Sequence, residues 1–183
     1  MVNFKTTKTI RNLTLSAILV SLGVIFSFID VMISRAAFPF LPTAKIGIAN
    51  IIILIGIYAF DFKTSLSMAV LKAALTGLIL GNMISFIISM SATLVSFFIM
   101  YLAHRAFKDK TSMVGVSVLG GFFHMVTQLF VVSVIYRLGD LVILYGALLV
   151  FVSLLTSIII GIVSNKLFSY LDGKNLIDDT IIE

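Results

Sequence analysis

The sequence predicts an all-α membrane protein: a polytopic bundle of six transmembrane helices that forms one domain over residues 1–183. The first observation is composition, because 60% of the residues are hydrophobic, 11% are charged and the mean hydropathy is +1.19. Soluble domains carry about 25% charged residues. The second observation is spacing, because the apolar residues gather in six runs. A helix needs about 20 mostly apolar residues to cross a bilayer, so the chain has room for six crossings and little else.

Short polar segments separate the runs, and they set the expected boundaries. The prolines both lie in SRAAFPFLPTAK, which we expect to be irregular because proline lacks an amide donor and restricts the residue before it. The second and third runs are near the lower length limit for crossing, so two separate spans and a re-entrant pair both stay open. The basic start MVNFKTTKTIRN precedes no small-residue cleavage site, so we expect a retained first span. The predicted spans are 13–34, 45–60, 64–80, 83–104, 113–136 and 141–169, followed by a short polar tail at 172–183.

The distribution of basic residues orients the predicted bundle. With the amino terminus inside, three cations lie outside, namely Arg35, Lys45 and Arg137, and Lys72 lies within a span. Nine lie inside: Lys5, Lys8, Arg11, Lys63, Arg105, Lys108, Lys110, Lys166 and Lys174. The positive-inside rule then places both termini in the cytoplasm. The net charge of +5 is explained by topology and contact with anionic lipid, and it does not indicate nucleic-acid binding.

Small residues recur at four-residue spacing, which is typical of helices that pack closely in a bilayer. Ala17 and Ser21 form such a stripe near the inner end of the first span. Two alternatives stay open for each stripe: contact between helices of this chain, or docking of a partner helix. The other stripes are Gly23 and Ser27; Gly77 and Gly81; Ser85, Ser89 and Thr93; and Ser153, Ser157 and Gly161.

Polar residues inside the apolar runs are the candidate functional residues. Lys72 stands in the middle of SLSMAVLKAALTGLIL, where a lysine costs about 2.5 to 3.5 kcal/mol on insertion scales. Such residues generally face the bundle interior or a wet cavity. Lys72 therefore pairs with Asp30, snorkels, or contacts a ligand. Asp30 has the alternative of being an exposed carboxylate at a helix end, and Asn50 that of bonding a neighbouring helix.

A histidine and a glutamine in GGFFHMVTQLF complete the candidate site. His124 and Gln128 are four residues apart, so they share one face of the fifth predicted helix. A structural role in packing is one interpretation. The other is a pocket in the outer half of the bundle, where the pair meets Asn50 and Lys72. A pocket with one cation and several neutral hydrogen-bonding groups suits a small polar or anionic ligand.

Catalytic and metal sites find little support in the sequence. There are two histidines and no cysteines, which falls short of the three or four ligands that a metal site needs. No phosphate-binding loop is present, so a transport function would require an ATPase on another chain. We expect neither a metal nor a cofactor. The ending LIDDTIIE has two adjacent acids without a second acidic pair, and is expected to be a solvated tail.

The order of these features resembles the substrate-binding S components of energy-coupling factor (ECF) transporters. The shared features are a basic start, six spans with both ends inside, and AILVS in place of their AxxxA docking motif. Three segments resemble more closely the Gx transporter family, also labelled heptaprenyl diphosphate synthase component I. They are FSFID, PFLPTAKIGIANIIILIGIYAFDFKTSLSMAVLKAALTGLILG and LGGFFHMVTQLFVV, and the match runs from about residue 9 to 169.

The resemblance implies a function, partners and site residues. S components capture a vitamin or similar small molecule near the outer face of the bacterial cytoplasmic membrane, and associate with a transmembrane coupling subunit and two cytoplasmic ATPases. Ala17 and Ser21 match the docking stripe, with serine in place of the second alanine. The polar positions that match the Gx-like pattern, and that we expect to contact a ligand, are Asp30, Lys45, Asn50, Lys72, His124 and Gln128.

The synthase label suggests a second hypothesis. Prenyl diphosphate elongation needs clustered aspartates that hold magnesium, and the sequence lacks such clusters. The chain would then be a noncatalytic membrane scaffold or partner of an isoprenoid- or quinone-pathway enzyme, or of a flavin-linked extracellular electron-transfer system. Copurifying proteins discriminate the two hypotheses, because a transporter subunit should bring ATPases and a scaffold should bring the enzyme.

Overall fold

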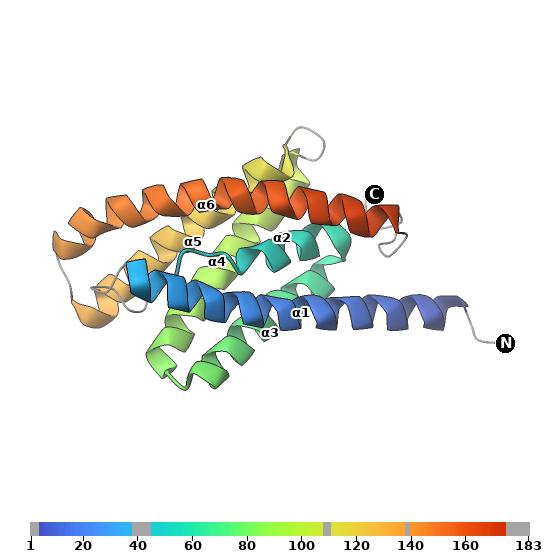
Figure 1. The fold of residues 1–183 in the computed structure, drawn as a ribbon, viewed down its shortest axis with the longest axis horizontal. Helices are drawn as coiled ribbons and strands as arrows, with labels where there is room; N and C mark the ends of the chain where they lie inside the picture. The colour runs from blue at the N-terminus through green and yellow to red at the C-terminus, as the bar shows by residue number, and fades with distance from the viewer. Residues whose placement is uncertain (1–3, 38–44, 108–110, 138–139, 175–183) are drawn as a thin grey trace.

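Six α-helices make up the fold, and no strand occurs in the part of the chain that the computed structural model describes, residues 4–37, 45–107, 111–137 and 140–174. Every helix except α2 is long and apolar enough to cross a membrane. The predicted all-α polytopic bundle is therefore confirmed (Figure 1). The helices are α1 (Phe4–Ala37), α2 (Asn50–Ala59), α3 (Phe62–Leu80), α4 (Met83–Phe107), α5 (Met113–Tyr136) and α6 (Asp140–Gly173).

Most predicted boundaries agree with the observed ones, and the differences lie at the helix ends. The prediction for α5 is confirmed at both ends, and α3 and α4 differ from it by at most three residues. The basic start is helical from Phe4, because α1 begins well before the predicted span. At the other terminus α6 continues to Gly173, so the first residues of the predicted tail are helical, and LIDDTIIE lies outside the described residues.

Local side-chain chemistry explains where the helices begin and end. The Asp61 carboxylate accepts hydrogen bonds from the backbone N–H groups of Lys63 and Thr64, at 3.1 and 3.4 Å, and so caps the first turn of α3. Gly81 ends α3 in the left-handed region, with φ of 63°. Ser112 caps α5 by accepting from the backbone N–H of Gly115 at 3.1 Å.

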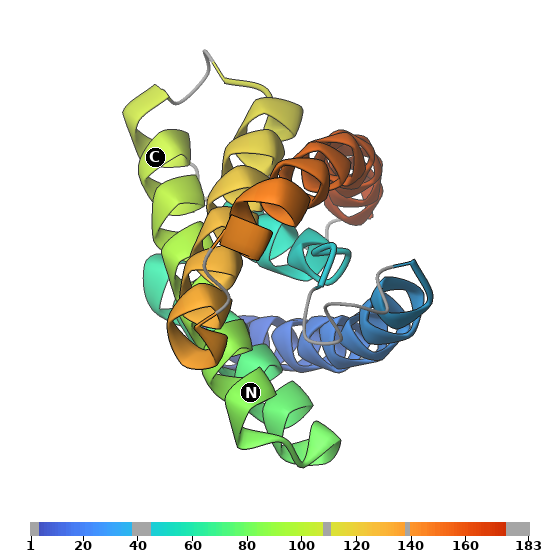
Figure 2. The same cartoon turned by 90° about the vertical axis from the view of Figure 1, so that its left-hand side faces the viewer.

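The second run differs most from its prediction, because the helix covers only Asn50–Ala59 of the expected span 45–60. Gly47 has a φ of 99°, which an α-helix cannot accommodate, and residues 48 and 49 form a turn. All of α2 except Tyr58 is buried. Between α1 and α6, α2 begins inside the bundle and runs toward the end where both termini lie (Figures 1 and 2). This run is therefore an irregular segment, residues 45–49, followed by a short helix.

Helices α4, α5 and α6 pack closely through small residues. Ser153 donates to the carbonyl of Gly121 at 3.1 Å, and Ser117 donates to the carbonyl of Ser157 at 2.7 Å. A methyl group on Gly121 would collide with the Ser157 side chain. The stripe on α6 therefore serves contact between helices of this chain, the first of the two alternatives.

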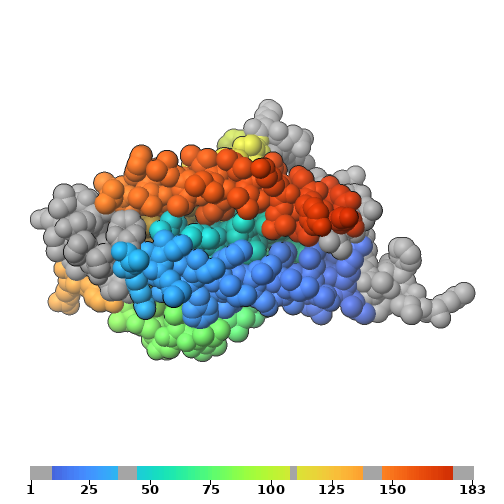
Figure 3. All heavy atoms as spheres, viewed as in Figure 1, coloured from blue at the N-terminus to red at the C-terminus, as the bar shows by residue number. Residues whose placement is uncertain are grey.

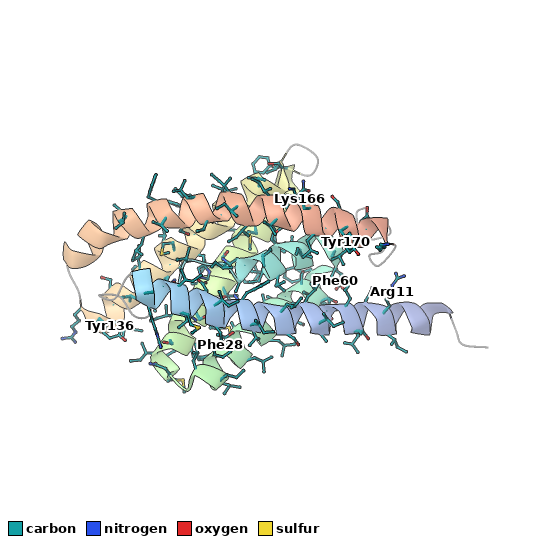
Figure 4. All side chains as sticks on the ribbon, in the orientation of Figure 1. Arg11, Phe28, Phe60, Tyr136, Lys166 and Tyr170 are labelled. Carbon is teal, nitrogen blue, oxygen red and sulfur yellow. The ribbon has the colours of Figure 1, made fainter. Side chains whose placement is uncertain are left out.

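The outer surface and the two ends of the bundle are consistent with a membrane protein. Large apolar side chains such as Ile25, Met32 and Ile159 are exposed on the outside of α1 and α6, and only a narrow strip of α2 is visible between these helices (Figure 3). Arg11 and Lys166 lie toward the end where both termini are found, and Tyr136 lies at the opposite end (Figure 4). The shared end agrees with an even number of crossings; its cytoplasmic location stays a prediction.

Candidate functional site

The structure brings the six predicted ligand-contact residues together around the start of α2. They come from α1 (Asp30), the irregular segment (Lys45), α2 (Asn50), α3 (Lys72) and α5 (His124 and Gln128). None of the six is more than 7% exposed. The charges of Lys45 and Lys72 both act on Asp30 and on His124, which places the four ionisable groups in one electrostatic neighbourhood. We call these six residues the polar cluster.

Asp30 fixes the irregular segment by binding its backbone. One carboxylate oxygen, Oδ1, accepts from the N–H of Ile46, and the other, Oδ2, accepts from the N–H of Gly47, both at 2.9 Å. Ser34, one turn later on α1, donates to Asp30 at 3.5 Å and accepts from the N–H of Ile46 at 3.3 Å. Asp30 is 2% exposed, so the alternative of an exposed carboxylate at a helix end is wrong.

Gln128 holds the same segment from α5. Its Oε1 accepts from the N–H of Lys45 at 2.9 Å, and its Nε2 donates to the carbonyl of Lys45 at 3.1 Å. Non-helical backbone at membrane depth needs such partners, because lipid offers none. Asp30, Ser34 and Gln128 therefore form a backbone clamp on residues 45–47. Their ligand contact stays a prediction, since the main hydrogen-bonding groups of Asp30 and Gln128 are engaged by backbone.

A second group of polar atoms is buried without a hydrogen-bond partner among the residues that the structure describes. It contains both side-chain atoms of Asn50, Nδ1 of His124 and the hydroxyl of Thr93. The His124 imidazole lies near the backbone of Ala92 on α4. An unsatisfied buried polar group costs about 1–3 kcal/mol, so each such group in a native protein calls for an explanation. Binding of a polar molecule would explain several at once.

Lys72 is 4% exposed, and its charge acts on His124, one of the residues with an unpaired atom. Its stem packs against Gly23 of α1: a Cβ added to Gly23 would lie 3.2 Å from Cγ of Lys72 and 3.4 Å from Ile52 in the first turn of α2. Among the described residues Lys72 has no ion pair within the 4.0 Å limit, although the charge of Asp30 acts on it. Lys72 and Asp30, which were predicted to pair, are therefore close enough for their charges to interact but form no ion pair.

Some residues of this region were not singled out as site residues from the sequence. Ser34 follows Asp30 by four residues, and this spacing on one helix face was an available signal. Thr93 appeared only as part of a small-residue stripe. Gly47 gave no signal of its own, yet a Cβ there would lie 3.4 Å from Nδ2 of Asn50 and 3.9 Å from the His124 ring. Gly47 thus allows the backbone to approach both side chains.

The predicted docking residues lie apart from the polar cluster, on the exposed face of α1. Ala17 and Ser21 line a shallow depression that extends along this helix from Leu13 to Ile25. The Ser21 hydroxyl donates to the carbonyl of Ala17 at 2.9 Å, so its polar group is satisfied within the helix. The stripe therefore presents a small surface that a partner helix can approach closely.

Comparison with protein families assigns residues 19–167 to the family described as heptaprenyl diphosphate synthase component I. The chain belongs to this family. The component I region includes all six residues of the polar cluster and Ser21, whereas Ala17 lies just before it. Neither the curated proteins nor the solved structures gave a match. In the described ranges no three His, Cys, Asp or Glu side chains lie close enough together to hold a metal ion.

Proposed function

We propose that this component I protein is the substrate-binding membrane subunit, the S component, of an ECF-type importer for a small vitamin- or cofactor-related molecule. The observation that carries the proposal is the pair of buried side chains with unpaired atoms, Asn50 and His124, which meet at Gly47 in the electrostatic neighbourhood of Lys72. These residues come from three different helices and lie inside a bundle, where small-molecule sites are commonly built. A structural role for all of them would leave several unsatisfied atoms unexplained.

The exposed stripe on α1 supports the second half of the proposal, attachment to a transport complex. A protein without its own ATPase needs a partner to drive uptake, and Ala17 and Ser21 offer a close-packing surface for a helix of the coupling subunit. Two cytoplasmic ATPases would complete the complex, and both termini would lie on their side of the bacterial cytoplasmic membrane.

Copurification of the full chain from its native membrane in mild detergent tests this function. We expect a coupling subunit, two ATPases and a retained small molecule. Ala17→Leu should abolish recovery of the ATPases, because the larger side chain would keep the partner helix away. Ala36→Leu makes the same change at an exposed position near the other end of α1, and should leave recovery intact. Recovery of neither ATPases nor a small molecule would contradict the proposal.

The family description favours an alternative function, a noncatalytic membrane partner of an isoprenoid-pathway enzyme. The resemblance in sequence extends this alternative to a quinone-pathway enzyme or a flavin-linked electron-transfer system. In that case the same purification recovers a prenyl diphosphate synthase chain or an electron-transfer enzyme instead of ATPases. Under this alternative the unpaired groups would bind no imported solute, so a retained vitamin-like molecule would argue against it.

A further inference from the structure

We infer that the polar cluster binds the anionic group of its ligand, a carboxylate or a phosphoryl group, between Lys72 and the first turn of α2. The inference rests on the proposed function, since it names the chemical class of the molecule that the S component would bind. It is argued from the balance of charges, from the position of a helix terminus and from the unpaired neutral groups beside them.

The charges of the polar cluster do not balance. Lys45 and Lys72 are both buried and their charges act on one another, whereas Asp30 is the acidic residue that acts on each of them. The two oxygens of Asp30 are already engaged by the N–H groups of Ile46 and Gly47. When both lysines are protonated, two ammonium groups and one carboxylate leave an excess positive charge in a low-dielectric interior, where an unpaired charge is costly. A ligand with one negative charge would neutralise it.

The start of α2 adds a second attraction for an anion. Helix N-termini carry a partial positive charge and bind carboxylates and phosphates through their free N–H groups. This terminus lies inside the bundle, and its first flanking residue, Ala49, provides no side-chain cap. The N–H groups of Asn50 and Ile51 donate to the carbonyls of Gly47 and Ile48 at 2.9 and 3.3 Å, so the attraction comes from the helix dipole and from the N–H groups that follow them. A Cβ built on Gly23 would lie 3.2 Å from Cγ of Lys72 and 3.4 Å from Ile52 of the first turn, so the stem of the Lys72 side chain lies beside this helix terminus.

The neutral side chains of Asn50 and His124 would lie around the anionic group of the ligand. Asn50 offers one donor and one acceptor, and Nδ1 of His124 offers one more position; all three are buried without partners. Gly47 brings the Asn50 amide and the His124 ring to one place. The ligand should therefore carry hydrogen-bonding groups next to its anionic end. A cationic ligand is disfavoured by the two lysines, and a neutral one would leave their charge unbalanced.

The test compares matched pairs of molecules that differ in one charge, added to the full chain in lipid nanodiscs. The carboxylate pairs are nicotinate with nicotinamide and pantothenate with pantothenol, and the phosphoryl pair is pyridoxal phosphate with pyridoxal. Acetate and inorganic phosphate serve as minimal anions at matched ionic strength, with chloride as reference. The readout is the melting temperature from circular dichroism, followed by calorimetric titration of every molecule that shifts it.

We expect acetate or inorganic phosphate, and the charged member of at least one pair, to stabilise the wild type. The charged member should bind at least tenfold more tightly than its neutral partner. Which pair responds distinguishes a carboxylate from a phosphoryl ligand. Lys72→Met should remove the preference, Lys72→Arg should retain most of it, and Lys63→Met, an exposed lysine on the same helix, should leave it unchanged.

Two results would overturn the inference: no anion-dependent stabilisation in the wild type, or equal stabilisation of wild type and Lys72→Met. Lys72→Met should fold, because replacing a buried ammonium that lacks an ion pair removes a desolvation cost. Its melting temperature without anion should equal or exceed that of the wild type. ATPase copurification from the same samples separates failure of this inference from failure of the proposed function. Recovery of ATPases together with anion-independent binding would leave the proposed function standing and would contradict only the negative charge of the ligand.

Discussion

The polar cluster contains two pairs of residues, Asp30 with Gln128 and Asn50 with His124, whose buried polar groups differ in hydrogen bonding. In the backbone clamp, the Asp30 carboxylate and the Gln128 amide are engaged by the backbone of residues 45–47. A few ångströms away, beside Gly47, Asn50 and His124 keep side-chain atoms with no partner. Burial is the same in both pairs, with exposure between 2% and 5% for these four residues. Under the proposed function, the clamp stabilises the fold and the unpaired groups bind the ligand.

The largest effect on stability is expected when the clamp loses its carboxylate. Asp30→Ala would leave the N–H of Gly47 buried without an acceptor and the N–H of Ile46 with only its longer bond to Ser34, at 3.3 Å, so we expect a loss of about 3 kcal/mol. Heating the protein in detergent and following helical circular dichroism would show it. Asp30→Asn keeps one acceptor oxygen and should lose less. An unchanged melting temperature for Asp30→Ala would remove the distinction between the two pairs of residues.

A smaller loss is expected at the other side of the clamp. Gln128→Leu deprives the N–H and the carbonyl of Lys45 of their partners, and we expect destabilisation of about 2 kcal/mol. Gln128→Glu keeps the acceptor for the N–H and loses the donor, so its melting temperature should fall between those of the wild type and Gln128→Leu. The opposite order of the two variants would show that Gln128 stabilises by volume and not by its hydrogen bonds.

Asp61 offers the same chemistry as Asp30 without the burial, and it sharpens the comparison. Its carboxylate also accepts from two backbone N–H groups, but it is exposed, and the Thr64 hydroxyl bonded to it holds the pKa of Asp61 below its usual range. Asp61→Ala should cost about 1 kcal/mol, the typical value of a helix cap.

The lowered pKa of Asp61 gives this effect a defined pH dependence. A carboxyl group with a depressed pKa in the folded state stabilises the protein fully above its unfolded pKa of about 3.9, and loses this contribution as the pH falls through the folded pKa. The gap in melting temperature between wild type and Asp61→Ala should therefore be constant near neutral pH and shrink below about pH 4. Asp61→Asn keeps a capping oxygen and should show a smaller gap with no such pH dependence.

The smallest effect on stability is expected at the unpaired groups. Asn50→Leu removes two unsatisfied buried atoms, so the free energy of unfolding should rise, or should fall by less than about 1 kcal/mol. Binding of the small molecule retained by the wild type should nevertheless fall at least tenfold, as measured by calorimetric titration. A loss of stability as large as that of Gln128→Leu would mean that Asn50 belongs to the structural part of the cluster.

The sequence was a good guide to the helices and a weaker one to the backbone between them. Apolar run length predicted α5 correctly at both ends, because this signal is local. The start of α2 was misplaced because hydropathy carries no information about the backbone φ of Gly47. An apolar irregular segment has the same mean hydropathy as an apolar helix. Candidate site residues were identified because a polar side chain in an apolar run is conspicuous on its own. Their division into clamp and unpaired groups depends on where the irregular backbone passes, which no residue pattern specifies.

The short helix α2 also bears on how the protein is made. Its lead-in exposes backbone groups that lipid cannot satisfy, and the partners for them come from Asp30 of α1 and Gln128 of α5. Its apolar side chains in turn pack against Ile160 and Leu171 of α6. During synthesis α2 therefore emerges second, yet its surroundings are complete only when the last helix has entered the membrane. We expect this segment to wait at the insertion machinery or the bilayer surface until then, so that truncation before α6 should yield a chain whose second segment stays accessible to protease.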